Sequence, residues 1–259
     1  MKESFIYQVD AIELVSALFI LMLGAIFIGS KLGKTRFEKY GENVGNGTIV
    51  SSLFGLFAFL LAFTFGMSSS RFDSRREALV NEANAIGTAM LRSDLYTDTL
   101  KTAFRNDFKA YTEARIFYYQ AGWNSEKLNR AKETSDSAAR SLWKRAADIT
   151  KNDLGFVKSN QMIIALNEMF DSATTRNFRE TARVPDSVVI MLFVLSLASS
   201  FYAGYISVGK GRLDWFIIIS FCLLTSMVTY ITLDLDRPRR GLINMDATHQ
   251  AMLDLRGLY

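Results

Sequence analysis

The stretch IVSSLFGLFAFLLAFTFGMS, residues 49–68, decides the fold, because its twenty consecutive residues include no charged side chain. A helix of about this length crosses a hydrocarbon core of roughly 30 Å. Three further apolar stretches of similar length stand at residues 11–30, 187–208 and 215–233. We therefore predict an all-α integral membrane protein with four transmembrane helices.

The four stretches come in two pairs, with about 115 mostly polar residues between the pairs. This spacing predicts two transmembrane hairpins with a water-facing domain between the second and third helices. The expected division is a first hairpin over residues 1–70, a soluble helical domain over 71–186, a second hairpin over 187–236 and a C-terminal tail over 237–259.

The long polar segment has the periodicity of amphipathic helices. Apolar residues recur at helical spacing over 97–121, 125–149 and 156–181, and a run over 72–90 continues the second span. Thr97 is a candidate helix cap, and Gly122 closes the helix that follows it. Several amphipathic helices in a row predict a helical bundle.

The composition leaves little for catalysis or metal binding. The chain has one cysteine, Cys222, inside an apolar stretch, and one histidine, His249. These residues form no disulfide and no metal cluster, so we expect no catalytic residues, no metal and no cofactor, and an enzyme is disfavoured. The cores of the spans also lack ionisable residues, which argues against proton-driven transporters and voltage sensors.

The distribution of Lys and Arg gives a modest bias in orientation. An even number of crossings puts both termini and the large domain on one side, which carries ten basic residues near the spans against six on the other. The positive-inside rule then favours a cytoplasmic domain. The first hairpin alone argues the reverse, because the residues from Lys31 to Lys39 outnumber Lys2.

The net charge of +4 and the pI of about 9.1 point to membrane lipids. The excess arginines flank the membrane spans, where anionic headgroups are the nearest partners. We therefore expect no nucleic-acid partner.

The second span carries five phenylalanines within residues 54–65. One helical face holds Phe54, Phe57 or Ala58, Leu61 and Phe65. If several copies turned this face to a common axis, it would form a hydrophobic constriction that gates ions by dewetting. Phenylalanine is also an ordinary lipid-facing residue, so the face has a second interpretation.

Two polar blocks follow the second and fourth spans. The first comprises Arg71-Phe72-Asp73-Ser74-Arg75-Arg76 and a run from Asn81 to Arg92, and the second is Asp234-Leu235-Asp236-Arg237-Pro238-Arg239-Arg240-Gly241. These blocks resemble the signature of the bacterial bestrophin-like membrane proteins, over nearly the whole chain. That family is distantly similar to the bestrophins.

The resemblance implies a homo-oligomer in the bacterial inner membrane. Bestrophins are pentameric anion channels in which the second helix of each subunit lines a hydrophobic neck. An acidic cluster after their fourth span helps form a calcium clasp. Here only Asp234 and Asp236 stand at that place, and three arginines follow closely, so we expect no metal site.

The charged blocks also have a physical interpretation that needs no resemblance. Arginines directly outside a membrane span commonly bind lipid phosphates. The sharper hypothesis is an interhelix network or pore mouth, in which Asp73 pairs with an arginine of 237–240 and Asp234 or Asp236 pairs with Arg71 or Arg75. The residues of this network are Arg71, Asp73, Arg75, Arg76, Asp234, Asp236, Arg237, Arg239 and Arg240.

Two classes of function remain in view. The first is an oligomeric channel for small inorganic anions, with a pore lined by the second span and basic residues at its mouth. The second is a non-conducting receptor or scaffold, whose helical domain binds a cytoplasmic partner. The aromatic face of the second span does not decide between them.

Overall fold

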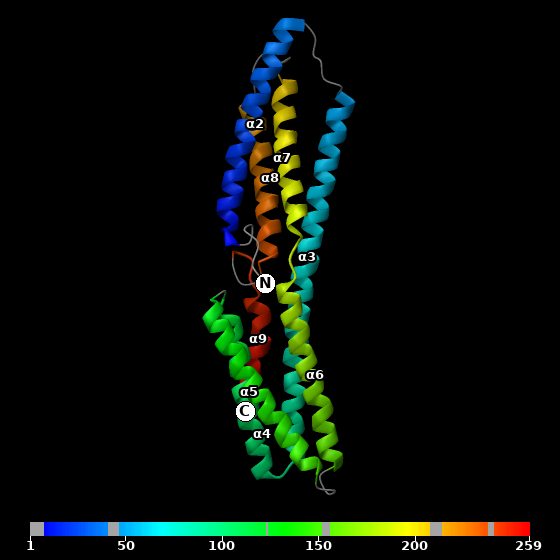
Figure 1. Ribbon diagram of the computed structural model, residues 1–259, viewed down its shortest axis with the longest axis vertical. Helices are drawn as coiled ribbons and strands as arrows, with labels where there is room; N and C mark the ends of the chain where they lie inside the picture. The colour runs from blue at the N-terminus through cyan, green and yellow to red at the C-terminus, as the bar shows by residue number, and fades with distance from the viewer. Residues whose placement is uncertain (1–7, 41–46, 123, 152–155, 208–213, 238–240) are drawn as a thin grey trace. The chain divides into compact units, whose positions relative to one another are not determined.

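The computed structural model describes residues 8–40, 47–122, 124–151, 156–207, 214–237 and 241–259. Every regular element in these ranges is a helix. In chain order they are α2 (Ala11–Tyr40), α3 (Gly47–Leu91), η1 (Arg92–Leu95), α4 (Asp98–Gln120), α5 (Ser125–Thr150), α6 (Phe156–Thr181), α7 (Asp186–Ile206), α8 (Trp215–Leu235), α9 (Asp246–Asp254) and η4 (Leu255–Leu258) (Figure 1).

Four helical segments are long and apolar enough to cross a membrane. They are Ala11–Lys39, Gly47–Leu95, Val157–Ile206 and Trp215–Leu235. Each contains one of the four apolar stretches, so the prediction of four membrane-crossing helices is confirmed at this level. In the third segment the apolar stretch belongs to α7, which begins directly after Pro185.

The chain divides into two compact units. The first, called here the membrane unit, comprises Met1–Arg71 and Arg183–Arg237, and the second, called the polar unit, comprises Phe72–Ala182 and Pro238–Tyr259. The sequence suggested a C-terminal tail over 237–259, and within that range Met252 and Leu255 belong to the hydrophobic core of the polar unit.

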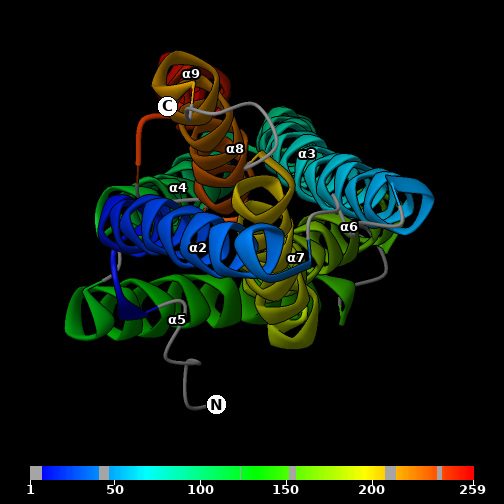
Figure 2. The ribbon, with the colours of Figure 1, turned by 90° about the horizontal axis from the view of Figure 1, so that it is seen from above.

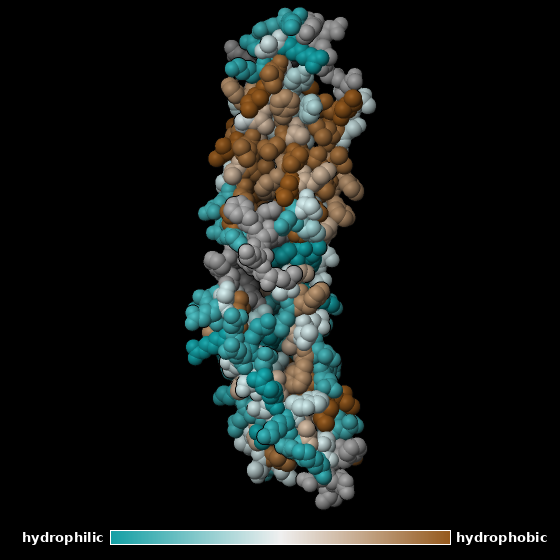
Figure 3. Space-filling view, in the orientation of Figure 1, coloured by the Kyte–Doolittle hydropathy of each residue, from teal (hydrophilic) through white to brown (hydrophobic). Residues whose placement is uncertain are grey.

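In the membrane unit, α2 packs along α7 and α8 (Figures 1 and 2). Two glycines allow α2 and α7 to approach closely. A Cβ built at Gly204 would lie 2.1 Å from the carbonyl oxygen of Ile26, and one built at Gly29 would lie 2.1 Å from that of Phe201. Helices in lipid pack through small residues in this way. On the face seen in Figure 3, hydrophobic side chains gather in a broad band along this unit, with hydrophilic residues at its upper end.

In the polar unit, α4 packs on α5 and α5 packs on α6. Their bounds match the expected helices within one residue at either end. Thr97 precedes α4 as expected, although its side chain makes no capping hydrogen bond. Gly122, with a φ of 59°, ends α4 in the left-handed conformation that glycine favours. The core includes Phe104, Phe108, Leu142 and Leu166.

Candidate functional site

The part of α3 inside the membrane unit has one face turned toward its own chain. Phe57 is only 4% exposed and packs with Leu192 and Leu195 of α7. The ring of Phe54 lies edge-on to that of Phe221 in α8, with ring centroids 6.2 Å apart. Two of the four expected pore-lining residues therefore contact helices of the same subunit.

The other two expected residues differ in accessibility. Leu61 is partly buried against the Phe57 cluster, whereas Phe65 is 39% exposed. No described residue of this chain covers the side of α3 opposite Phe57. The exposed residues along the centre of that side follow at spacings of four, three and four: Gly55, Phe59, Ala62 and Gly66. We call these four residues the outward face of α3.

The outward face combines three small residues with one aromatic residue, Phe59. A side chain added at Gly55 or Gly66 would meet no atom within 4 Å. Phe59 is 68% exposed, and its ring stacks on that of Phe63, with centroids 6.2 Å apart. Another helix can therefore approach this side of α3 closely beside two projecting rings.

The arginines after the second span have different environments. Arg75 is 1% exposed and donates hydrogen bonds to the carbonyl oxygens of Arg179 (3.2 Å) and Ala182 (2.6 Å). It therefore neutralises the C-terminal end of α6, where unpaired carbonyls gather. Arg179 in turn donates to the carbonyl oxygen of Ser74 at 2.9 Å. Arg75 therefore has a structural role inside the polar unit, whereas the neighbouring Arg76 is exposed.

The acidic members of the expected network also have particular partners. Asp73 lies 3.8 Å from Arg76 on the same helix, and both side chains are largely exposed. Asp236 is buried and accepts a hydrogen bond of 2.7 Å from the backbone N–H of Val184, next to the start of α7. In the same region Arg183 donates to the carbonyl oxygen of Asp236 at 2.8 Å.

The remaining members of the expected network lie at the ends of the second and fourth spans. Asp234 and Arg237 are both buried at the end of α8, and Arg71 is partly buried on α3. Arg239 and Arg240 lie outside the described residues. A pairing of Asp73 with either of them therefore stays a prediction.

Sequence reasoning missed a buried charge cluster in the polar unit. Glu82 of α3 is fully buried and accepts hydrogen bonds from Arg115 of α4 and from Arg176 of α6, the latter at 2.8 Å. Arg176 also donates to Glu180 at 2.9 Å. Both guanidinium groups lie over the ring of Tyr118. The cluster joins three helices through two carboxylates and two arginines.

The ionisation of this cluster follows from its contacts. Burial alone would raise the pKa of the Glu82 carboxyl, but the positive charges of Arg115 and Arg176 outweigh burial and hold that pKa below its ordinary value. Burial would likewise lower the pKa of Arg115, and the charge of Glu82 reverses the direction and raises it. Glu82 is therefore a permanent carboxylate at neutral pH.

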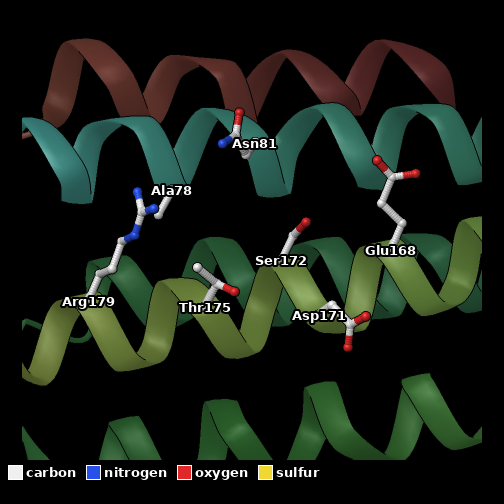
Figure 4. A pocket seen from close by; sticks show the side chains of 7 residues that line it. All are labelled: Ala78, Asn81, Glu168, Asp171, Ser172, Thr175 and Arg179. Atoms are coloured by element: carbon white, nitrogen blue, oxygen red, sulfur yellow. The ribbon is translucent and has the colours of Figure 1, made fainter.

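A shallow cleft of about 400 Å³ lies between α3 and α6 in the polar unit. Figure 4 shows Asn81 on α3 opposite Ser172, Thr175 and Arg179 on α6. The lining is polar and of mixed charge, so it selects no ligand chemistry. Among the described residues, no group of three or more His, Cys, Asp or Glu side chains could hold a metal ion.

The model of the Bestrophin-like domain matches residues 16–248 of the sequence. The chain belongs to the Bestrophin-like family. The match spans most of the first apolar helix, the other three apolar helices and most of the polar unit. A search of the curated proteins finds no match.

Solved structures agree with this Bestrophin-like assignment. A bacterial bestrophin homologue from Klebsiella pneumoniae, solved by Zn-SAD phasing, aligns with a TM-score of 0.66 at 15% identity, covering 95% of this chain and 98% of that one. A point variant of that homologue gives a TM-score of 0.65 at 15% identity, with 94% and 99% covered. At this identity the likeness establishes a shared fold.

Proposed function

We propose that this Bestrophin-like chain is one subunit of a homo-oligomeric channel for small inorganic anions, with a pore lined by the outward face of α3. The observation that carries the proposal is that the part of the chain that the structure describes leaves this face exposed. Gly55 and Gly66 provide room for the α3 helix of a neighbouring copy. Phe59 and Phe63 would then project toward the axis.

A ring of phenylalanines on the axis would form a hydrophobic neck. Such a constriction resists hydration, and it closes to ions by dewetting. The sequence pointed to the neighbouring face with Phe54, Phe57, Leu61 and Phe65. The burial of Phe57 moves the proposed lining around the helix by about a third of a turn, toward Phe59 and Phe63, and Phe65 remains accessible at its edge.

The remaining features of the proposal concern charge and location. Arg71 and Arg76 would raise the local anion concentration at the mouth, whereas Arg75 is buried and takes no part. We propose a pentamer, by resemblance, in the bacterial inner membrane among anionic lipids. The polar unit and both termini would face the cytoplasm.

Flux into liposomes tests this proposal. Replacing Phe59 and Phe63 together with alanine should widen and wet the neck, so chloride flux should rise severalfold over that of the unmodified protein. Phe57→Leu is the matched control, because it changes the same residue type on the same helix at a side buried against α7. It should leave flux unchanged.

Selectivity gives a second measurement. Neutralising Arg71 and Arg76 should weaken the preference for chloride over sodium, more at low salt than at high salt, where screening already weakens their field. An oligomer in which all these variants stay folded and impermeable would contradict the channel and favour the non-conducting scaffold. A preference for sodium over chloride would support a pore but contradict the proposed anion selectivity.

A further inference from the structure

The C-terminal segment, residues 246–259, is docked on the polar unit. Met252 of α9 is fully buried in the core of this unit, and Leu255 of η4 is 7% exposed there. Gly87 of α3 makes room for the segment, because a Cβ at that position would lie 3.3 Å from Cδ2 of Leu255. The segment is therefore part of the fold.

Polar contacts fix both ends of this segment to α4. Near its start, the Tyr119 hydroxyl donates to Oδ1 of Asp246 at 2.8 Å. At its end, Arg256 donates two hydrogen bonds, of 2.8 and 2.7 Å, to the two carboxylate oxygens of Glu113, and the Tyr259 hydroxyl donates to Glu113 as well. Such bidentate pairs are specific in geometry.

The middle of the segment carries the only histidine of the chain. His249 is 4% exposed, and its ring stacks on that of Tyr119, with centroids 4.1 Å apart and planes 22° apart. Neither ring nitrogen has a hydrogen-bond partner among the described residues. A buried imidazole of this kind packs as an aromatic ring, and no hydrogen-bond acceptor among the described residues contacts it to stabilise a second proton.

The charges around His249 oppose its protonation. Arg176 of α6 and Arg256 of η4 both act against a positive imidazole, and Asp246 on its own helix is the carboxylate that favours one. That carboxylate already accepts the Tyr119 hydrogen bond. From α3, Arg76 donates to Thr248, the residue next to His249, at 3.2 Å. Arginines of α6 and η4 therefore oppose a positive ring, and a third arginine, from α3, contacts the residue next to it.

We propose that His249 is a pH-sensitive latch: the neutral ring holds α9 against α4, and protonation undocks residues 246–259 from the polar unit. The undocked segment would place the imidazolium in water, where no neighbouring cation opposes it. Glu113 and Arg256, which fix the far end of the segment, keep their charge over the same pH range, because their mutual hydrogen bonds lower the pKa of Glu113 and raise that of Arg256. The response is therefore assigned to the histidine.

The sign and size of the response follow from the two states of the ring. Burial, and after it the charge of Arg176, lowers the pKa of docked His249 to about 4, against about 6.5 in a solvated chain. The docked state therefore binds fewer protons between these values. Docking is fully stable above the higher pKa and weakens as pH falls toward the lower one. The undocking equilibrium constant should rise by about 30-fold between pH 8 and pH 5.

Hydrogen exchange of the full-length protein in detergent tests the latch. The opening constant of the α9 amides, corrected for the intrinsic pH dependence of exchange, should increase by about 30-fold at pH 5 relative to pH 8. The amides of α5 serve as the internal reference and should not respond. In His249→Phe, which retains a ring against Tyr119 but cannot titrate, the α9 amides should lose this response.

Glu113→Gln is the matched variant. It weakens the contacts with Arg256 and Tyr259 at every pH, so it should raise α9 exchange at both pH values and preserve the 30-fold ratio. Glu113 stays ionised at pH 5, because the hydrogen bond from Arg256 holds the pKa of its carboxyl below the ordinary value. A ratio lost in Glu113→Gln, or retained in His249→Phe, would overturn the assignment.

The single histidine also allows a measurement without any variant. Its one imidazole resonance in the NMR spectrum of the intact protein should titrate well below the solvated value, as the α9 amides lose protection. A resonance that titrates at about 6.5, with α9 still protected, would overturn the latch.

Discussion

The two units bury polar groups of different kinds. In the membrane unit, the buried polar side chains of α7, and those of α8 before Asp234, are hydroxyls. Several donate a hydrogen bond to the carbonyl oxygen four residues earlier on the same helix, as Ser196 and Thr229 do. In the polar unit the buried groups include Glu82, Arg115 and Arg176. The hydroxyls of Ser196 and Thr229 are thus satisfied within single helices, whereas Glu82 is satisfied by arginines from two other helices.

The difference follows from the surroundings of each unit. A helix in hydrocarbon must satisfy its polar groups without water, and a hydroxyl can do so on its own backbone. Apolar burial gives little advantage there, so close approach at Gly29 and Gly204 provides the packing. Outside the membrane, a buried carboxylate is tolerable only when cations pair with it. The strength of an interaction should therefore depend on the unit that contains it.

The largest effect is expected at Glu82. Glu82→Ala leaves Arg115 and Arg176 buried without their shared carboxylate, and breaking a buried pair costs about 3 to 5 kcal/mol of unfolding free energy. Chemical unfolding of the full-length protein, followed by hydrogen exchange in α4 and α6, measures the loss. The control is Glu77→Ala, because Glu77 lies on the same helix and pairs with Arg179 while 65% exposed. It should cost under about 1 kcal/mol.

A smaller effect is expected in the membrane unit. Gly204→Ala places a methyl group 2.1 Å from a backbone carbonyl of α2, so the helices must separate. Such overpacking costs about 1 to 3 kcal/mol. Unfolding in mixed micelles measures it, and Gly24→Ala is the control, because a Cβ at Gly24 meets nothing within 4 Å. Equal losses for the two variants would mean that close contact does not hold this unit together.

The helices could be predicted well from the sequence because each one has its own local periodicity of apolar residues. The expected helix over 125–149 is Ser125–Thr150 in the structure, with Asn124 accepting a hydrogen bond from the backbone N–H of Lys127 at its start. The helices of the polar unit could be predicted because apolar and charged residues alternate there with a helical period. Element type and position follow from such patterns alone.

Two features depended on information that local patterns lack. The partners of Glu82 lie 33 and 94 residues away, so no local spacing pairs them. The second span is apolar on every side, so its periodicity could not separate the buried Phe57 from the exposed Phe59. The docking of α9 also depends on contacts with α3 and α4, and the sequence alone suggested only a tail.

Arg75 lies between the extremes of this comparison. It is buried like Arg115, but its described hydrogen bonds go to the carbonyls at the end of α6 and not to a carboxylate. Arg75→Met should cost about 1 to 3 kcal/mol, because buried carbonyls lose their donor. Unfolding of the full-length protein measures it, beside Arg76→Met, which removes an exposed arginine from the next position. A loss as large as that of Glu82→Ala would indicate a further charged partner.

The smallest effect is expected at Asp73, where the sequence suggested a network between helices. Its ion pair with Arg76 has side-chain exposures of 68% and 53%, so water screens it. Asp73→Ala should cost under about 1 kcal/mol, and a double-mutant cycle with Arg76 should give a coupling of about 0.3 to 0.5 kcal/mol, as for other exposed pairs on one helix. The same cycle with Arg239 and with Arg240 tests the hypothesis of a network between helices.

A coupling of several kcal/mol with either arginine would support the buried network, because only a desolvated pair is that strong. Coupling near zero with both would leave those arginines free to bind lipid phosphates, and the exposed charges of this region would then act on ions and headgroups more than on the stability of the fold.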